Sequence, residues 1–111
     1  MNAKGAVITE GQCYADGIER LFIGFKKDCL GELPATEGER VPFQLLVNGE
    51  RLKAGIRMTE KNDLAWICPD AYDLKGEKHR LPDILSSLGI EKNDTVQVKE
   101  EGDAFVIYRS V

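Results

Sequence analysis

The dipeptide Asn48-Gly49 constrains the fold of this chain more than any other feature. Asn-Gly suits the left-handed positions of a type I′ turn, which joins the two strands of a tight β-hairpin. Apolar residues alternate on both sides of it, as strands with one buried face require. They are Val41, Phe43, Leu45 and Val47 before the turn and Leu52, Ala54, Ile56 and Met58 after it. The sequence therefore predicts a β-hairpin over residues 41–58.

Five further segments have the composition of short strands bounded by turn residues. They cover residues 4–10, 21–25, 64–68, 95–99 and 104–109. In the third of these, Leu64, Trp66 and Cys68 alternate, and we expect the indole of Trp66 to face the core rather than to form an exposed stacking surface. The glycine-containing segment 11–20 and the polar segment 70–78 predict two long loops.

The segment from Leu81 to Gly89 predicts a short helix. Pro82 suits the first helical position, where its missing N–H costs nothing, and Gly89 suits the left-handed conformation that ends a helix. Asp83 suits the positive end of the helix dipole. The apolar residues at helical spacing are Leu81, Ile84, Leu85 and Leu88. One or two further helical turns are predicted over residues 26–33.

With 111 residues, of which 42% are hydrophobic, the chain is long enough for one domain with a substantial core, spanning residues 1–111. The two halves show weak internal similarity, because Leu30-Gly31 resembles Leu88-Gly89 and Asn48-Gly49-Glu50 resembles Glu101-Gly102-Asp103. Turns attract the same residues in any β-rich chain, so duplication and chance both stay open. The prediction is a mainly β, single-domain pseudobarrel of about seven strands with two short helices.

The charge balance is acidic, with 15 lysines and arginines against 19 acidic residues and a net charge of −4. This total counts against a dedicated nucleic-acid binder, although it is compatible with a local basic stripe. Cys13, Cys29 and Cys68 form no CxxC pair, and their spacing predicts neither a disulfide framework nor a metal site with His79. No apolar run is long enough for a signal peptide or a membrane span, so we expect a cytoplasmic protein without a membrane partner.

The C-terminal half resembles a known DNA-binding motif. It combines Leu81-Pro82 at a helix start, Leu88-Gly89 at its end, a polar turn over residues 90–94 and the alternating Val96 and Val98. This pattern is similar to the swapped hairpin of AbrB-type transcription factors. From about Leu21 to Arg109, the order of elements resembles the DNA-binding pseudobarrels of restriction-endonuclease effector domains and plant transcription factors.

In that class two arms flank the barrel and grip double-stranded DNA. Carried onto this sequence, the arms are residues 11–20 and 57–64. The resemblance implies contacts from Gln12, Tyr14 and Arg20 in the first arm and from Arg57, Lys61 and Asn62 in the second. The arms and their flanks also contain acidic residues that repel phosphate, namely Glu10, Asp16, Glu19, Glu60 and Asp63.

Independently of any family, the second strand of the predicted hairpin has a basic face. Arg51, Lys53 and Arg57 occupy alternate positions, opposite the apolar residues of the same strand. With Lys61 beyond the turn, they form a basic stripe. Two interpretations stay open: a solvated face that prevents pairing with other sheets, or a surface that binds phosphate.

No catalytic signature accompanies these features. The glycines never form GxGxxG or GxxxxGK, and His79 has no serine or cysteine at a suggestive spacing. We therefore predict a non-enzymatic protein without cofactor or metal. The leading hypothesis is a DNA-binding or nucleic-acid-associated module. The alternative is a small acidic domain that binds a protein or a small ligand on a β-barrel scaffold.

Overall fold

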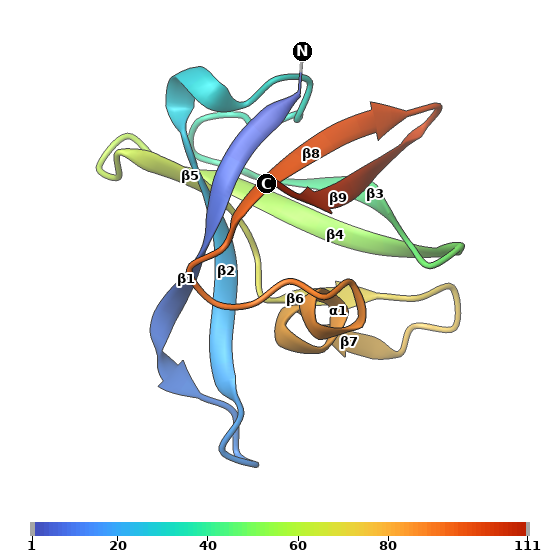
Figure 1. The fold of residues 1–111 in the computed structure, drawn as a ribbon. Helices are drawn as coiled ribbons and strands as arrows, with labels where there is room; N and C mark the ends of the chain where they lie inside the picture. The colour runs from blue at the N-terminus through green and yellow to red at the C-terminus, as the bar shows by residue number, and fades with distance from the viewer. Residues whose placement is uncertain (1, 111) are drawn as a thin grey trace.

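Nine β-strands form a single sheet in the computed structural model, which describes residues 2–110 (Figure 1). They are β1 (Ala3–Cys13), β2 (Glu19–Lys26), β3 (Arg40–Val47), β4 (Glu50–Met58), β5 (Leu64–Ile67), β6 (Asp70–Tyr72), β7 (Lys78–Arg80), β8 (Thr95–Glu101) and β9 (Ala104–Arg109). A 3-10 turn, η1 (Lys27–Cys29), follows β2, and an α-helix, α1 (Leu81–Ser87), follows β7. The protein is therefore mainly β, as the sequence predicts.

Seven of the strands close into a barrel. Their hydrogen-bonded order is β3-β9-β8-β1-β2-β5-β4, and β4 pairs again with β3. The contact between β3 and β9 is parallel and joins Leu45 to Phe105, whereas β3 and β4 pair antiparallel along the whole of β3. The short strands β6 and β7 form a hairpin that attaches to β4 through Lys53 and Tyr72. The predicted seven-stranded barrel is confirmed.

The hairpin predicted around Asn48-Gly49 is also confirmed. Asn48 and Gly49 have φ angles of 50° and 83°, the left-handed values that a type I′ turn requires. The register places Leu45 opposite Leu52, and both side chains are buried. The residues directly before and after Leu45 and Leu52 in each strand therefore point away from the barrel interior.

One apolar cluster fills the barrel, and every buried side chain in the described part of the chain is apolar. The predicted apolar face of α1 is confirmed, because Leu81, Ile84 and Leu85 belong to this cluster. Leu33, in the connection before β3, also belongs to it. In Figure 1, η1 lies near the upper end of the barrel and α1 near its lower end.

Gly5 makes room for the largest fully buried side chain, Phe25. The two residues are paired across β1 and β2. A Cβ atom at residue 5 would lie 2.5 Å from the carbonyl oxygen of Gly24 and 2.7 Å from the ring of Phe25. Because the backbone carbonyl belongs to a neighbouring strand and cannot retreat easily, this position requires glycine.

The second predicted helix is wrong. In place of one or two α-helical turns over residues 26–33, the chain forms only the 3-10 turn η1. No side chain caps the start of η1, and Gly31 adopts a left-handed φ of 54° two residues after its end. The residues between 2 and 110 therefore contain one α-helix, and the short element after β2 cannot propagate.

The two predicted loops are also shorter than expected. Residues 70–78 contain β6 and the start of β7, and Asp73 holds the turn between them by accepting backbone N–H bonds from Lys75 and Glu77. In the first arm, β1 continues to Cys13 and β2 begins at Glu19, so the turn covers only residues 14–18. In both segments the polar composition predicts a loop although the main chain is paired, because edge and hairpin strands tolerate polar side chains.

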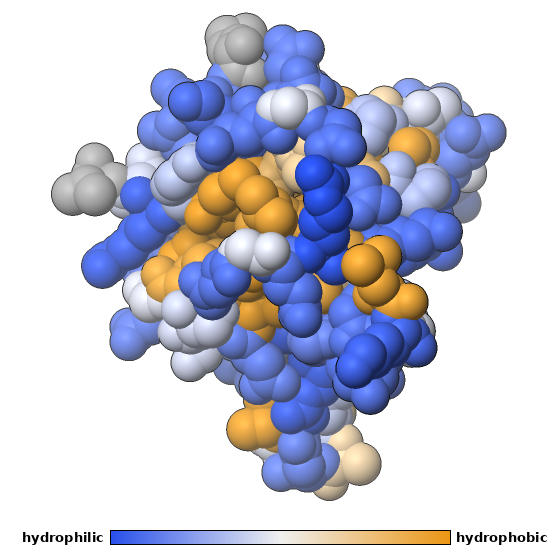
Figure 2. Space-filling model, turned by 90° about the vertical axis from the view of Figure 1, so that its right-hand side faces the viewer, coloured by the Kyte–Doolittle hydropathy of each residue, from blue (hydrophilic) through white to orange (hydrophobic). Residues whose placement is uncertain are grey.

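Apolar side chains are not confined to the interior. Among residues 2–110 the exposed large ones are Ile18, Tyr72, Leu74 and Tyr108. Leu74, in the turn between β6 and β7, is 90% exposed. Figure 2 shows that apolar surface gathers at the centre of one face and is bordered by hydrophilic residues. Exposed apolar surface of this kind is typical of regions that contact other molecules.

The fit of Phe25 over Gly5 yields a stability prediction. Gly5→Ala should lower the free energy of unfolding by roughly 2–3 kcal/mol, because the new methyl group collides with backbone. Gly24→Ala is the matched control, since its Cβ would meet the mobile Cδ1 of Ile8 at 2.9 Å. We expect that control to lose less than about 1 kcal/mol. Urea unfolding measures both values, and equal losses would contradict the proposed role of Gly5.

Candidate functional site

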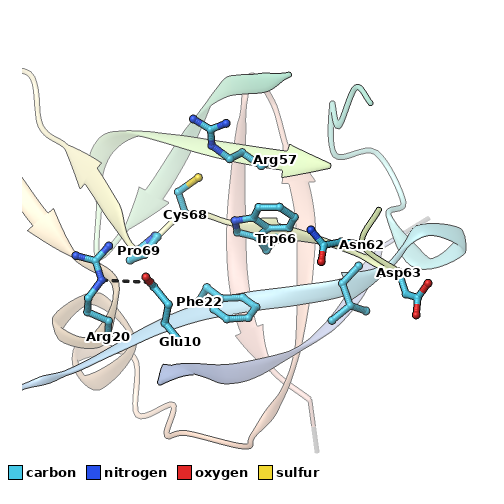
Figure 3. Close-up of a pocket in the computed structure, with 10 residues that line it drawn as sticks. Glu10, Arg20, Phe22, Arg57, Asn62, Asp63, Trp66, Cys68 and Pro69 are labelled. Atoms are coloured by element: carbon cyan, nitrogen blue, oxygen red, sulfur yellow. Dashed lines mark hydrogen bonds and ion pairs between the residues drawn. The ribbon is translucent and has the colours of Figure 1, made fainter. Parts of the chain in front are cut away.

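An open groove of about 640 Å³ runs over the outer face of β2, β5 and β4 (Figure 3). Phe22 of β2 and Trp66 of β5 form its apolar floor, and Arg57 of β4 borders it. In Figure 3, the indole of Trp66 lies at the centre, between Arg57 and Phe22. The groove therefore combines two aromatic rings with a cationic edge, a combination that recognises planar, charged ligands.

The face of β5 that forms this groove is the opposite of the predicted one. Ala65 and Ile67 are buried in the barrel, whereas Trp66 is half-buried on the outer face. The reason is the register, which places Ile67 between the fully buried Ile23 of β2 and Ile56 of β4. A shift of β5 by one residue would exchange its inner and outer faces. In the observed register the interior contains the smaller side chains, those of Ala65 and Ile67. The prediction that Trp66 belongs to the core is therefore wrong.

Trp66 belongs to a row of residues that crosses four strands. Arg40 of β3 is paired with Arg57 of β4, Arg57 with Trp66, and Trp66 with Gly24 of β2. Neighbouring strands lie about 4.8 Å apart, so two arginines and an indole stand side by side on the outer face. We call these three residues the Arg40–Arg57–Trp66 row.

Gly55 allows the side chain of Arg40 to lie close to the sheet. A Cβ atom at residue 55 would be only 2.3 Å from Cζ of Arg40. The guanidinium group of Arg40 therefore crosses from β3 and covers the backbone of β4 at Gly55. Arg57 lies two residues further along β4. Gly55 belongs to the residues of β4 that face outward, but it is buried because the guanidinium group covers it.

No ion pair within the described residues neutralises the basic side chains of this face. Arg40, Lys53 and Arg57 are exposed, and none of them forms an ion pair with another residue of the described range 2–110. Arg40 and Arg57 are directly opposite each other, and like charges in such positions destabilise a sheet. All three line a second groove, to which Asp70 adds one carboxylate. This groove adjoins the first, because both share Arg20, Arg57 and Cys68. The arrangement suits an anionic ligand.

Tyr14 fixes the first arm against the barrel. The guanidinium groups of Arg20 and Arg80 lie 5.0 and 4.6 Å from the centre of its ring. Its hydroxyl lies 3.3 Å from the carbonyl oxygen of Pro69 and 3.4 Å from the carboxylate of Asp70, and it donates to both. Burial and the adjacent Asp70 carboxylate raise the pKa of Tyr14 to about 12. The phenol therefore stays protonated at neutral pH and acts as an anchor for the arm.

The structure brings together part of the predicted contact set. The predicted residues that line the two grooves are Arg20, Lys53, Arg57 and Asn62. Those that line neither groove are Gln12, Tyr14, Arg51 and Lys61. Arg51 forms an ion pair of 2.9 Å with Asp103, in the turn between β8 and β9, and Arg20 forms one of 3.2 Å with Glu10. The basic surface is therefore shorter along β4 than predicted, and it extends sideways onto β3.

Three residues of the site are not predicted from the sequence to contact a ligand. They are Arg40, Phe22 and Trp66, of which Trp66 is predicted to lie in the core. Arg40 directly precedes the alternating segment 41–47, so its outer position follows from that alternation. Phe22 lies in the run Leu21–Phe25, where nearly every residue is apolar and the pattern does not distinguish the two faces. The same ambiguity affects Trp66.

His79 lies in a separate cluster on the β6–β7 hairpin. Its Nε2 atom is 2.9 Å from Asp73 Oδ2 and 4.0 Å from Glu50 Oε1. The hydrogen bond with Asp73 raises the pKa of His79 above its usual 6.5 and lowers the pKa of Asp73. The pair joins the two ends of the hairpin turn, which indicates a structural role. Between residues 2 and 110 the structure contains no group of three or more side chains suited to hold a metal ion.

Comparisons with protein-family models, with curated proteins and with solved structures find no match for this chain. Within the described residues, no helix has the length and apolar character needed to cross a membrane.

The environment of His79 yields a pH prediction. His79 is the only histidine in the chain, so its ring protons give an unambiguous NMR titration. We expect a midpoint above 6.5, and a return toward 6.5 in Asp73→Asn. Because the folded pKa is raised, the stabilisation from this pair is complete below 6.5 and is lost as pH rises through the folded pKa. A wild-type midpoint at or below 6.5 would show that the pair does not form.

Proposed function

We propose that this protein is a non-catalytic module that binds nucleic acid through the Arg40–Arg57–Trp66 row and the adjacent Lys53. The observation that carries the proposal is the pair of directly opposed arginines without a carboxylate partner. Such a pair costs stability in the free protein. Guanidinium groups bind phosphate oxygens through charge-assisted, bidentate hydrogen bonds, so a phosphate between them would relieve the repulsion.

Two hairpins stand beside this surface in positions suited to contact a nucleic-acid backbone. In Figure 1, the β1–β2 hairpin projects below the barrel and the β4–β5 connection projects at its left side. Gln12 is exposed on the first, and Lys61 and Asn62 are exposed on the second. Polar and basic side chains of this kind contact phosphate and sugar, which positions the ligand without reading its sequence.

The acidic total charge makes the proposed binding depend on the local surface. A net charge of −4 repels a polyanion at long range, whereas Arg40, Lys53 and Arg57 attract it at contact. Increasing salt screens both effects, and it also weakens the release of counterions that drives phosphate binding. We therefore expect moderate affinity at low salt and a steep loss of affinity as salt rises.

A protein–protein or small-ligand binding domain is the second candidate function. It is favoured by the apolar area visible in Figure 2 and by the exposed Leu74. Such a partner would bury apolar surface, so its affinity would change little with salt. The salt dependence of binding thus distinguishes the two candidates.

Charge reversal at Arg57 tests the proposed function. The ligand is a labelled DNA with a duplex part and a single-stranded tail, titrated at about 50 mM salt. Arg57→Glu should weaken binding by roughly 10-fold or more and reduce the salt slope by about 1. Arg51→Glu is the matched control, because it makes the same charge change on the same strand at a residue paired with Asp103 outside both grooves.

Two results would contradict the proposal. One is the absence of binding to the tailed DNA at this salt concentration. The other is binding that Arg57→Glu weakens no more than Arg51→Glu does. Circular dichroism of both variants verifies that each retains its β structure, so that a loss of binding is assigned to the surface.

A further inference from the structure

We infer that the groove over Trp66 holds one unpaired nucleobase, so that the preferred ligand is single-stranded or locally unpaired nucleic acid. This inference rests on the proposed function, because it assigns the base of a ligand whose phosphate the arginines bind. The inference gives a role to the apolar part of the site, because phosphate binding involves only its basic residues. Aromatic floors beside basic edges bind single strands because every base presents a face for stacking.

The indole of Trp66 is available for such a contact. It is half-buried at the centre of the groove and forms no hydrogen bond or aromatic ring contact with another residue of the described chain. Phe22 lies on the other side of the groove floor. A volume of about 640 Å³ lies within the range of sites that hold one small planar ligand.

The charges around the groove direct a nucleotide into one orientation. Arg57 and Arg40 lie one and two strand spacings from Trp66, so a phosphate bound by them places its own base over the indole. The border opposite Arg57 holds Glu10, which is paired with Arg20, and Asp63 lies at one end of the groove beside Asn62. Carboxylates there repel a phosphate, so the backbone follows β4 and β3 and the base points across β5.

The end of the groove offers hydrogen-bonding groups to the edge of a base. Asn62 lines the groove, and its Nδ2 atom donates to Thr59 Oγ1 at 2.9 Å, which holds the amide in place. The amide of Asn62 and the carboxylate of Asp63 suit the donors and acceptors of a base edge, which is exposed only when the base is unpaired.

An intact duplex cannot make these contacts. Its bases are stacked on one another and present only their edges in the grooves, so the face of the indole has no base face to meet. Duplex DNA is therefore limited to the arginine and lysine contacts with phosphate. The DNA and RNA forms of a single strand share the chemistry of base and phosphate, and both are included in the test.

Intrinsic fluorescence provides a direct readout, because Trp66 is the only tryptophan in the chain. The probes are a thymine oligonucleotide of about 12 nucleotides, its uracil RNA counterpart, an abasic strand with the same phosphates, and a blunt duplex. We expect the two strands with bases to quench Trp66 fluorescence and to bind roughly 5- to 150-fold more tightly than the abasic strand. The abasic strand and the duplex should leave the fluorescence nearly unchanged.

Substitutions separate the base contact from the phosphate contact, with binding measured by anisotropy of labelled strands. Trp66→Leu should weaken binding of the base-containing strands to the level of the abasic strand, and should leave abasic binding unchanged. Trp66→Phe retains an aromatic face and should restore part of the affinity. Arg57→Glu should weaken both kinds of strand by the same factor, because it removes only the phosphate contact.

The results distinguish failure of this inference from failure of the proposed function. If the abasic strand or the blunt duplex binds as tightly as the base-containing strands, and Arg57→Glu still weakens binding, the unpaired base is rejected and phosphate binding is retained. If Trp66→Leu affects all four probes equally, the indole supports the surface and does not stack on a base, so the inference is overturned. If no probe and no tailed DNA binds, both proposals are rejected.

Discussion

Closure of the sheet through β3 is the constraint on which the rest of the structure depends. β3 pairs with both β4 and β9, so seven strands enclose one interior. Each strand directs alternate residues inward, and the buried side chains are all apolar. Every residue of the other alternation lies outside, whatever its chemistry. Apolar residues on the outer face are therefore available to contact other molecules.

The candidate site follows from this division of each strand into two faces. β5 contributes Ala65 and Ile67 to the interior, so its largest residue, Trp66, stands outside. The pairing of β5 with β4 places Arg57 beside the indole, and the pairing of β4 with β3 adds Arg40. An aromatic surface and unneutralised cations thus meet on adjacent strands. Together they match the chemistry of a nucleotide.

The sequence predicts the architecture more completely than the site, for physical reasons. The Asn48-Gly49 turn and its alternating flanks have only one compatible conformation, so the hairpin and the mainly β class are predictable. The face of β5 is not, because both of its alternating sets are apolar and only tertiary pairing selects one. The prediction of a helix over residues 26–33 is wrong because a 3-10 turn of three residues is too short to produce a periodic pattern in the sequence. The pairing of Arg40 with Arg57 follows from the register that the two-residue turn imposes, whereas the position of Trp66 beside them depends on tertiary pairing.

The most direct test of this account is an NMR titration of the isotope-labelled protein with the thymine oligonucleotide. The account predicts that the largest shift changes occur at the indole N–H of Trp66 and at the Nε–H groups of Arg40 and Arg57. The N–H signals of β8 and β9, whose outer faces lie away from both grooves, should change little. Shifts concentrated on β8 and β9, or unchanged signals from the Arg40–Arg57–Trp66 row at saturating ligand, would contradict it.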